Sequence, residues 1–160
     1  VLGLWAGGCE LRVTPGSPPF PGKAYGFDVG CPALLVWDPE GGKHTSNYID
    51  DPNWISKITK AGESAVNRLS QYGWDQNIWK KLLDEADKFA LESGLLDEPE
   101  RAKLFSAVLD QADDSMSCHL CMLGTSLIVL PKNLRHISDY DELASKLRTL
   151  GLGVRETILQ

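Results

Sequence analysis

Hydrophobic residues recur every three to four positions through much of the chain after residue 50. Over residues 52–72 one such seam is formed by Trp54, Ile58, Ala61, Ala65, Leu69 and Tyr72. This spacing places the side chains on one face of an amphipathic helix. Asp51 is a good N-cap, Pro52 fits the first helical position, and Gly73 is a typical stop. The pattern predicts a helix over residues 52–72.

The same period predicts three further helices, over residues 76–93, 98–112 and 139–150. Gly94 and Gly151 follow the first and the last of them, as glycines commonly follow helix ends. A capping residue precedes each helix, namely Asp75, Asp97 (with Glu100 completing a capping box), and Ser138 or Asp139.

Residues 116–131 fit two patterns. Their apolar residues have helical spacing, whereas the stretch from Ser126 to Leu130, before Pro131, also resembles a buried strand. The length of the segment and its position after other helices favour a helix. Because the connections are short, the helices are expected to be antiparallel neighbours. The sequence thus predicts a mainly α protein, a four- or five-helix bundle over residues 46–160.

The N-terminal part has a different composition. Six of the nine prolines and nine of the fifteen glycines lie in residues 1–42. Residues 14–22 are expected to run extended, because proline fixes φ and lacks a backbone donor. Residues 25–29 and 33–37 could pair as one small β-hairpin. We therefore predict an extended arm over residues 1–45, in front of the bundle.

Composition and charge narrow the function. The chain has 160 residues, 42% of them hydrophobic, which is enough for a core. Its net charge of −6 argues against a general nucleic-acid binder and against a polybasic membrane-surface protein. The longest apolar run, residues 120–130, is shorter than the ~20 residues that cross a bilayer. We expect neither nucleic acid as a partner nor a direct membrane span.

The strongest local motif is Cys118-His119-Leu120-Cys121. Two thiols three positions apart on a helix could form a disulfide or half of a metal site. A zinc site needs two more ligands, and the sequence holds no second C-x-x-C. A thioredoxin-like motif would begin a helix after a strand. Cys118, His119 and Cys121 are thus weak metal candidates, and we expect no cofactor. A thiol-redox or zinc-dependent enzyme centred on this motif is the alternative function.

The cysteine count is even. With Cys9 and Cys31 in the loop-rich arm, we predict two disulfides and favour Cys9–Cys31 with Cys118–Cys121 among the three possible connectivities. Such bridges favour an extracytoplasmic compartment or an organelle lumen.

Large aromatic residues in the arm suggest how the protein works. Trp5, Phe20 and Trp37 lie where a separate core is hard to build, and aromatic residues dominate interface hot spots. We predict a non-catalytic accessory subunit that docks on a larger protein assembly, including a membrane-bound one. It would dock through its N-terminal arm, with these residues as anchors, and through the acidic helical bundle. An acidic helical bundle behind a proline-rich arm is similar in organisation to small extrinsic subunits of photosynthetic membrane complexes, an analogy of organisation alone.

Overall fold

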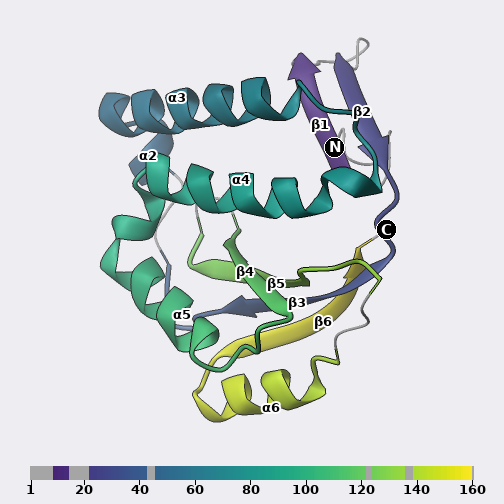
Figure 1. The fold of residues 1–160 in the computed structure, drawn as a ribbon. Coiled ribbons are helices and arrows are strands. Elements are labelled where there is room, and N and C mark those ends of the chain that lie inside the picture. Colours follow the sequence, from purple (N-terminus) through teal and green to yellow (C-terminus); the bar gives the residue numbers. More distant parts are fainter. Residues whose placement is uncertain (1–8, 15–21, 43–45, 122–123, 136–138, 160) are drawn as a thin grey trace.

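Helices and two antiparallel β-sheets build the fold in the computed structural model, which describes residues 9–14, 22–42, 46–121, 124–135 and 139–159. The protein is 46% helical and 26% strand. The predicted mainly α bundle is therefore wrong, and the chain is a mixed α/β protein (Figure 1).

The larger sheet has four strands in the order β4-β5-β3-β6, and each neighbouring pair is antiparallel. Its members are β3 (Cys31–Trp37), β4 (Met116–Leu120), β5 (Ser126–Pro131) and β6 (Gly153–Leu159). In the register of the sheet, Leu34 lies opposite Val129 of β5, and Leu35 lies opposite Arg155 of β6. Strand β3 is thus paired on both sides, within the segment that was predicted to be an arm.

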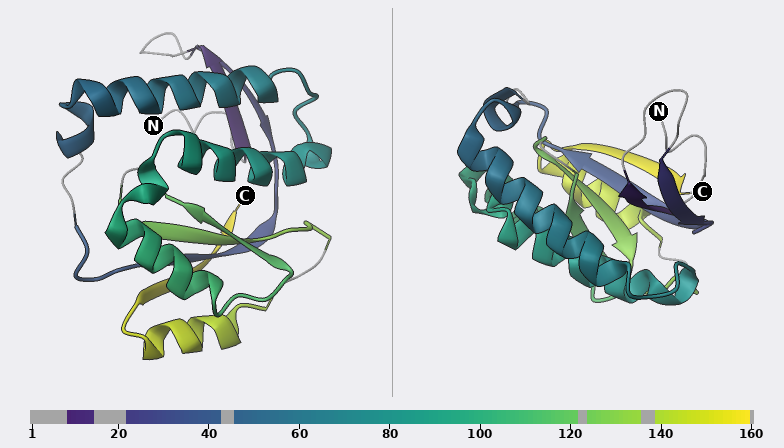
Figure 2. Two further views of the ribbon diagram at one scale, coloured as in Figure 1. Left: turned by 60° about the vertical axis from the view of Figure 1, so that its left-hand side comes forward. Right: turned by 90° about the horizontal axis from the view of Figure 1, so that it is seen from above.

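Helices cover both faces of this sheet. On one face, α5 (Pro99–Leu109) and α6 (Asp141–Thr149) pack against a core that includes Leu34, Val36 and Val129. On the other face, α4 (Trp79–Glu92) packs against Ala33 and Leu130. Helix α3 (Pro52–Leu69) lies beyond α4, which separates it from the sheet in both Figure 1 and Figure 2.

A helix is confirmed within each of the four periodic segments, and each is shorter than predicted, as α3 shows by ending at Leu69. Pro52 is the first residue of α3, and the Asp51 carboxylate accepts a hydrogen bond from the Asn53 N–H at 2.8 Å. Asp75 caps a short 3₁₀ turn, η1 (Gln76–Ile78), that leads into α4. The capping box of Asp97 is wrong in detail, because Asp97 belongs to η2 (Leu95–Asp97) and α5 begins later, at Pro99.

The smaller sheet is a ribbon of two strands, β1 (Cys9–Thr14) and β2 (Lys23–Phe27). It lies beside the junction of α3 and α4, at the upper right of Figure 1, where Leu11 packs with Leu69 and Ile78. The predicted hairpin of residues 25–29 with residues 33–37 is wrong, since β2 pairs with β1 and β3 belongs to the larger sheet. A short helix, α2 (Ser46–Ile49), precedes α3.

The helix favoured within residues 116–131 is wrong, because the described part of this segment contains strands β4 and β5. The cause is that β5 is covered on both faces. Leu127 and Val129 face α5 and α6, whereas Ile128 and Leu130 face α4. A strand buried on both sides is apolar at nearly every position, and such a run also contains the helical spacing.

Gly153 fits closely against Trp37, which lies opposite it in the register of β3 and β6. A Cβ atom built on Gly153 overlaps the indole ring of Trp37. We expect Gly153→Ala to lower the free energy of unfolding by about 1–3 kcal/mol, in the range for overpacked sites, as measured by urea denaturation. Gly42→Ala is the control, because a Cβ there meets nothing within 4 Å. If Gly153→Ala lowers the free energy of unfolding as much in a Trp37→Ala background as in the parent, the contact with Trp37 is not the cause of the loss.

Candidate functional site

The four cysteines are all free thiols, so both predicted disulfides are wrong. Cys9 and Cys31 belong to different sheets but pack in the same apolar cluster, where neither is bridged. Cys118 lies in β4, and Cys121 directly follows that strand. Because side chains alternate along a strand, residues three positions apart point to opposite faces. The C-x-x-C spacing brings two thiols together on a helix, and here it does not.

Burial makes these thiols poor nucleophiles. It is the main cause that raises the pKa of Cys9 and of Cys118 to about 11, and it also raises the pKa of Cys31 and Cys121. A thiol with a raised pKa holds little of the reactive thiolate at neutral pH. Within the described ranges, no three His, Cys, Asp or Glu side chains are grouped so that they could hold a metal ion. The structure thus lends no support to the thiol or zinc alternative.

The raised pKa values predict how stability depends on pH. The folded-state pKa of Cys9 and Cys118, about 11, lies above the ordinary value of 9.0. Their contribution to stability is therefore complete below pH 9 and is lost as the pH rises toward 11. We expect the urea midpoint to fall over this range by more in the parent than in a Cys9→Ala/Cys118→Ala variant. Equal falls in the two proteins would contradict the assignment.

Of the three predicted partner anchors, Trp5 and Phe20 lie outside the described residues. Trp37 ends β3 and is 38% exposed. Docking of this chain on a larger assembly through these residues stays a prediction.

His119 contacts an acidic residue, Asp87, and no sequence motif links the two. The histidine lies on β4, on the face opposite Cys118, and its Nδ1 is 2.9 Å from Oδ1 of Asp87 on α4. The imidazole is only 5% exposed, and its buried Nε2 has no hydrogen-bond partner among the residues that the structure describes. This is a polar pair at the boundary between α4 and the sheet.

A groove opens beside this pair. Its volume is about 800 Å³, and it lies between the first turns of α4 and the chain that leaves β5. Its lining includes both carboxylates of α4 that face this side, Asp84 and Asp87, and Ser117 of β4. Three cationic side chains line it as well, namely Lys80, Lys132 and Arg135.

Local contacts hold the two walls of the groove together. The buried Trp79 indole N–H, in the first turn of α4, donates to the carbonyl oxygen of Pro131 at 2.8 Å. Lys132 follows directly, and its backbone N–H donates to the Ser115 carbonyl at 2.8 Å. The side chain of Asn133 accepts from the Arg135 N–H at 3.0 Å. The backbone that carries Lys132 and Arg135 is thus fixed against the start of α4.

The cations of the groove are available for a ligand. Lys80, Lys132 and Arg135 are exposed, and none forms an ion pair with any residue in the described ranges. The groove therefore carries three positive groups and two carboxylates, in a chain whose net charge is −6. The positive end of the α4 dipole lies at the same place, where the N-cap residue Ile78 makes no side-chain hydrogen bond.

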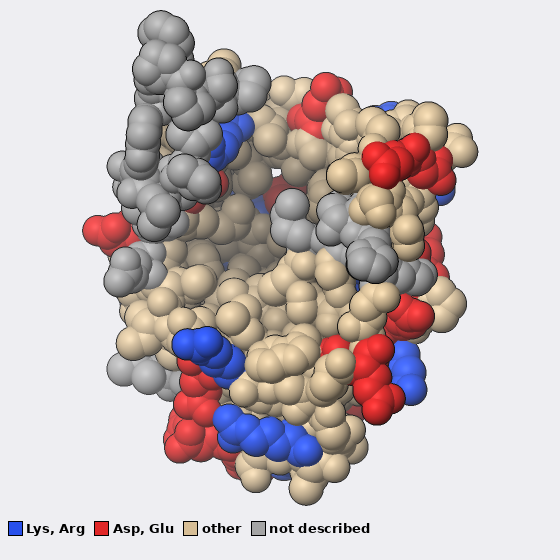
Figure 3. Space-filling model, turned by 180° about the vertical axis from the view of Figure 1, so that it is seen from behind, with Lys and Arg blue, Asp and Glu red and all other residues tan. Residues whose placement is uncertain are grey.

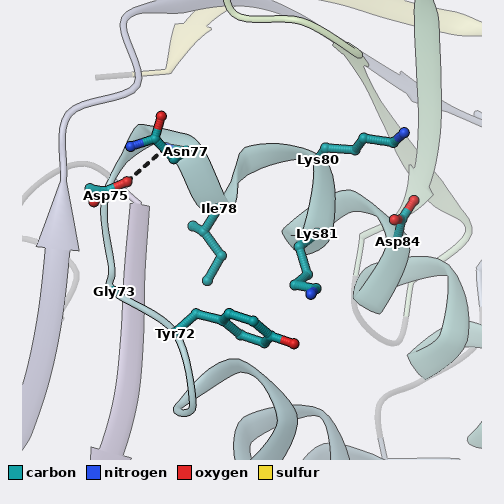
Figure 4. Close-up of a pocket in the computed structure, with 8 residues that line it drawn as sticks. All are labelled: Tyr72, Gly73, Asp75, Asn77, Ile78, Lys80, Lys81 and Asp84. Atoms are coloured by element: carbon teal, nitrogen blue, oxygen red, sulfur yellow. Dashed lines mark hydrogen bonds between the residues drawn. The ribbon is translucent and has the colours of Figure 1, made fainter.

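A second cavity, of about 390 Å³, lies across the same turns of α4. Tyr72, which follows α3, and Ile78, Lys81 and Asp84 line it, and Figure 4 shows their side chains around one open space. This cavity shares Asn77, Lys80 and Asp84 with the groove. The groove and the second cavity therefore lie side by side along η1 and the first turns of α4.

A separate buried cluster surrounds Arg101 of α5, which is only 2% exposed. Its guanidinium is paired with Glu98, lies over the ring of Tyr48 at 4.8 Å, and donates from Nε to the Gly124 carbonyl at 3.1 Å. The Tyr48 hydroxyl donates to the same carboxylate at 2.6 Å. Burial, together with Glu98, raises the pKa of Tyr48. The cluster joins α2, α5 and the connection between β4 and β5.

On the face of the molecule seen from behind, the described basic and acidic residues are interspersed. In Figure 3, which views it from behind, the lysine and arginine side chains stand near aspartate and glutamate side chains. No described helix has the length and apolar character needed to cross a membrane.

Comparison with known proteins adds little on function. No protein-family model and no curated protein sequence matches the chain. Among solved structures, the phosphomevalonate kinase of Streptococcus pneumoniae is similar, with a TM-score of 0.45 and 14% identity. The match covers 86% of this chain and 44% of that one. A likeness at this level carries no argument about activity.

Proposed function

We propose that the protein binds a small anionic molecule in the groove between α4 and the end of β5. One observation carries the proposal: three cations without an ionic partner in the described chain line a single hollow in an acidic protein. Unpaired cations of this kind, with a helix N-terminus beside them, attract phosphate and carboxylate groups.

The other groups of the groove suggest what else the ligand carries. The carboxylates of Asp84 and Asp87 accept hydrogen bonds, and the Ser117 hydroxyl and the Asn133 amide can both donate and accept. A ligand with hydroxyl or amino groups near its anion would satisfy them. Because Asp87 is also bound to His119, its position in the groove is fixed from the sheet side.

A stability measurement tests this proposal. We expect phosphate to raise Tm above the value in chloride of equal ionic strength, because a ligand that binds the folded state alone stabilises it. Lys132→Gln should remove most of that rise. Lys60→Gln is the matched control, since Lys60 is an exposed residue of α3 and does not line the groove. A rise of equal size in Lys132→Gln, or no rise in the parent, would contradict the proposal.

A further inference from the structure

The cavity beside Tyr72 has walls suited to a flat ring. Tyr72 was expected on the buried seam of α3, but the helix ends at Leu69 and the tyrosine side chain is 47% exposed. Its ring forms one wall of the cavity, and Ile78 points into the same space in Figure 4. Gly73 adds no side chain there. The partly exposed face of Tyr72 is a surface on which a planar group can stack, and the buried Ile78 lines the cavity beside it.

The lysine side chains at this cavity bear on where the anionic group of such a ligand would lie. Nζ of Lys81 lies 3.8 Å from the centroid of the Tyr72 ring, so the ammonium covers one face of the ring and a ligand ring that stacks on that face has to displace it. Lys80, the next residue, borders this cavity and the groove, and in Figure 4 its side chain extends away from the space between Tyr72 and Ile78. A ring in this cavity would therefore share it with Lys80 and Lys81, and Lys80 also lines the groove.

We infer that the ligand of the groove also carries a planar ring, which stacks on Tyr72 while the anion binds among Lys80, Lys132 and Arg135. This inference rests on the proposed function, because the groove supplies the site for the anion. The ligand is thus a phosphate or a carboxylate that also carries a ring.

The two hollows lie side by side, because Asn77 of η1 and Lys80 and Asp84 of α4 line both of them. A ligand that places its ring in one hollow and its anion in the other therefore needs a spacer between the two groups. Adenosine monophosphate has a ring, a sugar and a phosphate in this order, and serves as the probe.

Calorimetric titration of the full chain tests the inference with four probes: inorganic phosphate, ribose 5-phosphate, adenosine and adenosine monophosphate. Because stacking adds to the binding of the anion, we expect adenosine monophosphate to bind about tenfold or more tightly than ribose 5-phosphate. Tyr72→Leu should remove this advantage and leave phosphate binding unchanged. Tyr72→Phe keeps the ring and should retain the advantage.

The possible failures of the inference and of the proposed function can be told apart. If ribose 5-phosphate and adenosine monophosphate bind equally, the inference is overturned and the anion site stands. If adenosine binds as tightly as adenosine monophosphate, ring and anion do not bind together, which also overturns it. If none of the phosphates binds, the proposed function fails, and the inference fails with it.

Discussion

A chain shortened to begin at Ser46 is expected to lose its cooperative unfolding transition and much of its helical circular dichroism. The shortening removes β3, which pairs with both β5 and β6. Ala33, Leu34 and Val36 of this strand are completely buried, and they contribute to the cores on both faces of the sheet. Without them, α4, α5 and α6 would cover an interrupted sheet whose apolar residues face water.

A single substitution tests whether the buried residues of β3 stabilise the fold, without shortening the chain. Leu34→Ala should lower the free energy of unfolding by about 2–5 kcal/mol, as expected for a large-to-small change in a core. Ile158→Ala on the neighbouring β6 is the control, because Ile158 is 70% exposed and the change should cost less than about 0.5 kcal/mol. A shortened chain that still melts cooperatively would show that residues 46–160 form a domain by themselves.

The second large effect on stability is expected at the cluster around Arg101. We expect Arg101→Leu to lower the free energy of unfolding by about 3–5 kcal/mol, because it leaves the Glu98 carboxylate without its buried ionic partner. The change also removes the bond to the Gly124 carbonyl, which connects α5 to the segment between β4 and β5. Urea denaturation of parent and variant measures the difference.

A double variant separates the loss of charge pairing from the loss of packing. Glu98→Gln/Arg101→Leu removes both charges, so its cost should be clearly smaller than that of Arg101→Leu alone. If the double variant is as unstable as the single one, or less stable, the ion pair is not the cause. Lys103→Leu, on the same helix at an exposed position, should have little effect.

The local structure of the helices could be predicted from the sequence, whereas the sheet could not. Asp51 and Pro52 fix the start of α3 through backbone and capping preferences that depend on neighbouring residues alone. Strand β3 depends on partners far along the chain, since Trp37 lies opposite Ser126 and Gly153. Its short apolar run between Pro32 and Asp38-Pro39 therefore resembled part of an arm.

The groove was not visible in the sequence for a similar reason. Lys80, Lys132 and Arg135 form no motif. Their segments are brought together by the hydrogen bond from Trp79 to Pro131 and by an apolar cluster that includes Leu83, Leu130 and Leu134. The pairing of His119 with Asp87 likewise joins a strand to a helix that precedes it by 32 positions. The C-x-x-C spacing brings two thiols together on a helix. Along β4 and the residue after it, the same spacing places them on opposite faces.

The central claim is that the groove between α4 and the end of β5 binds an anion, and an NMR titration of the amide resonances with inorganic phosphate tests it most directly. The account predicts saturable shifts confined to the residues that border the groove, around Lys80 and from Lys132 to Arg135, and their loss in Lys132→Gln. Shifts that are absent, that do not saturate, or that centre on another part of the described surface would contradict it.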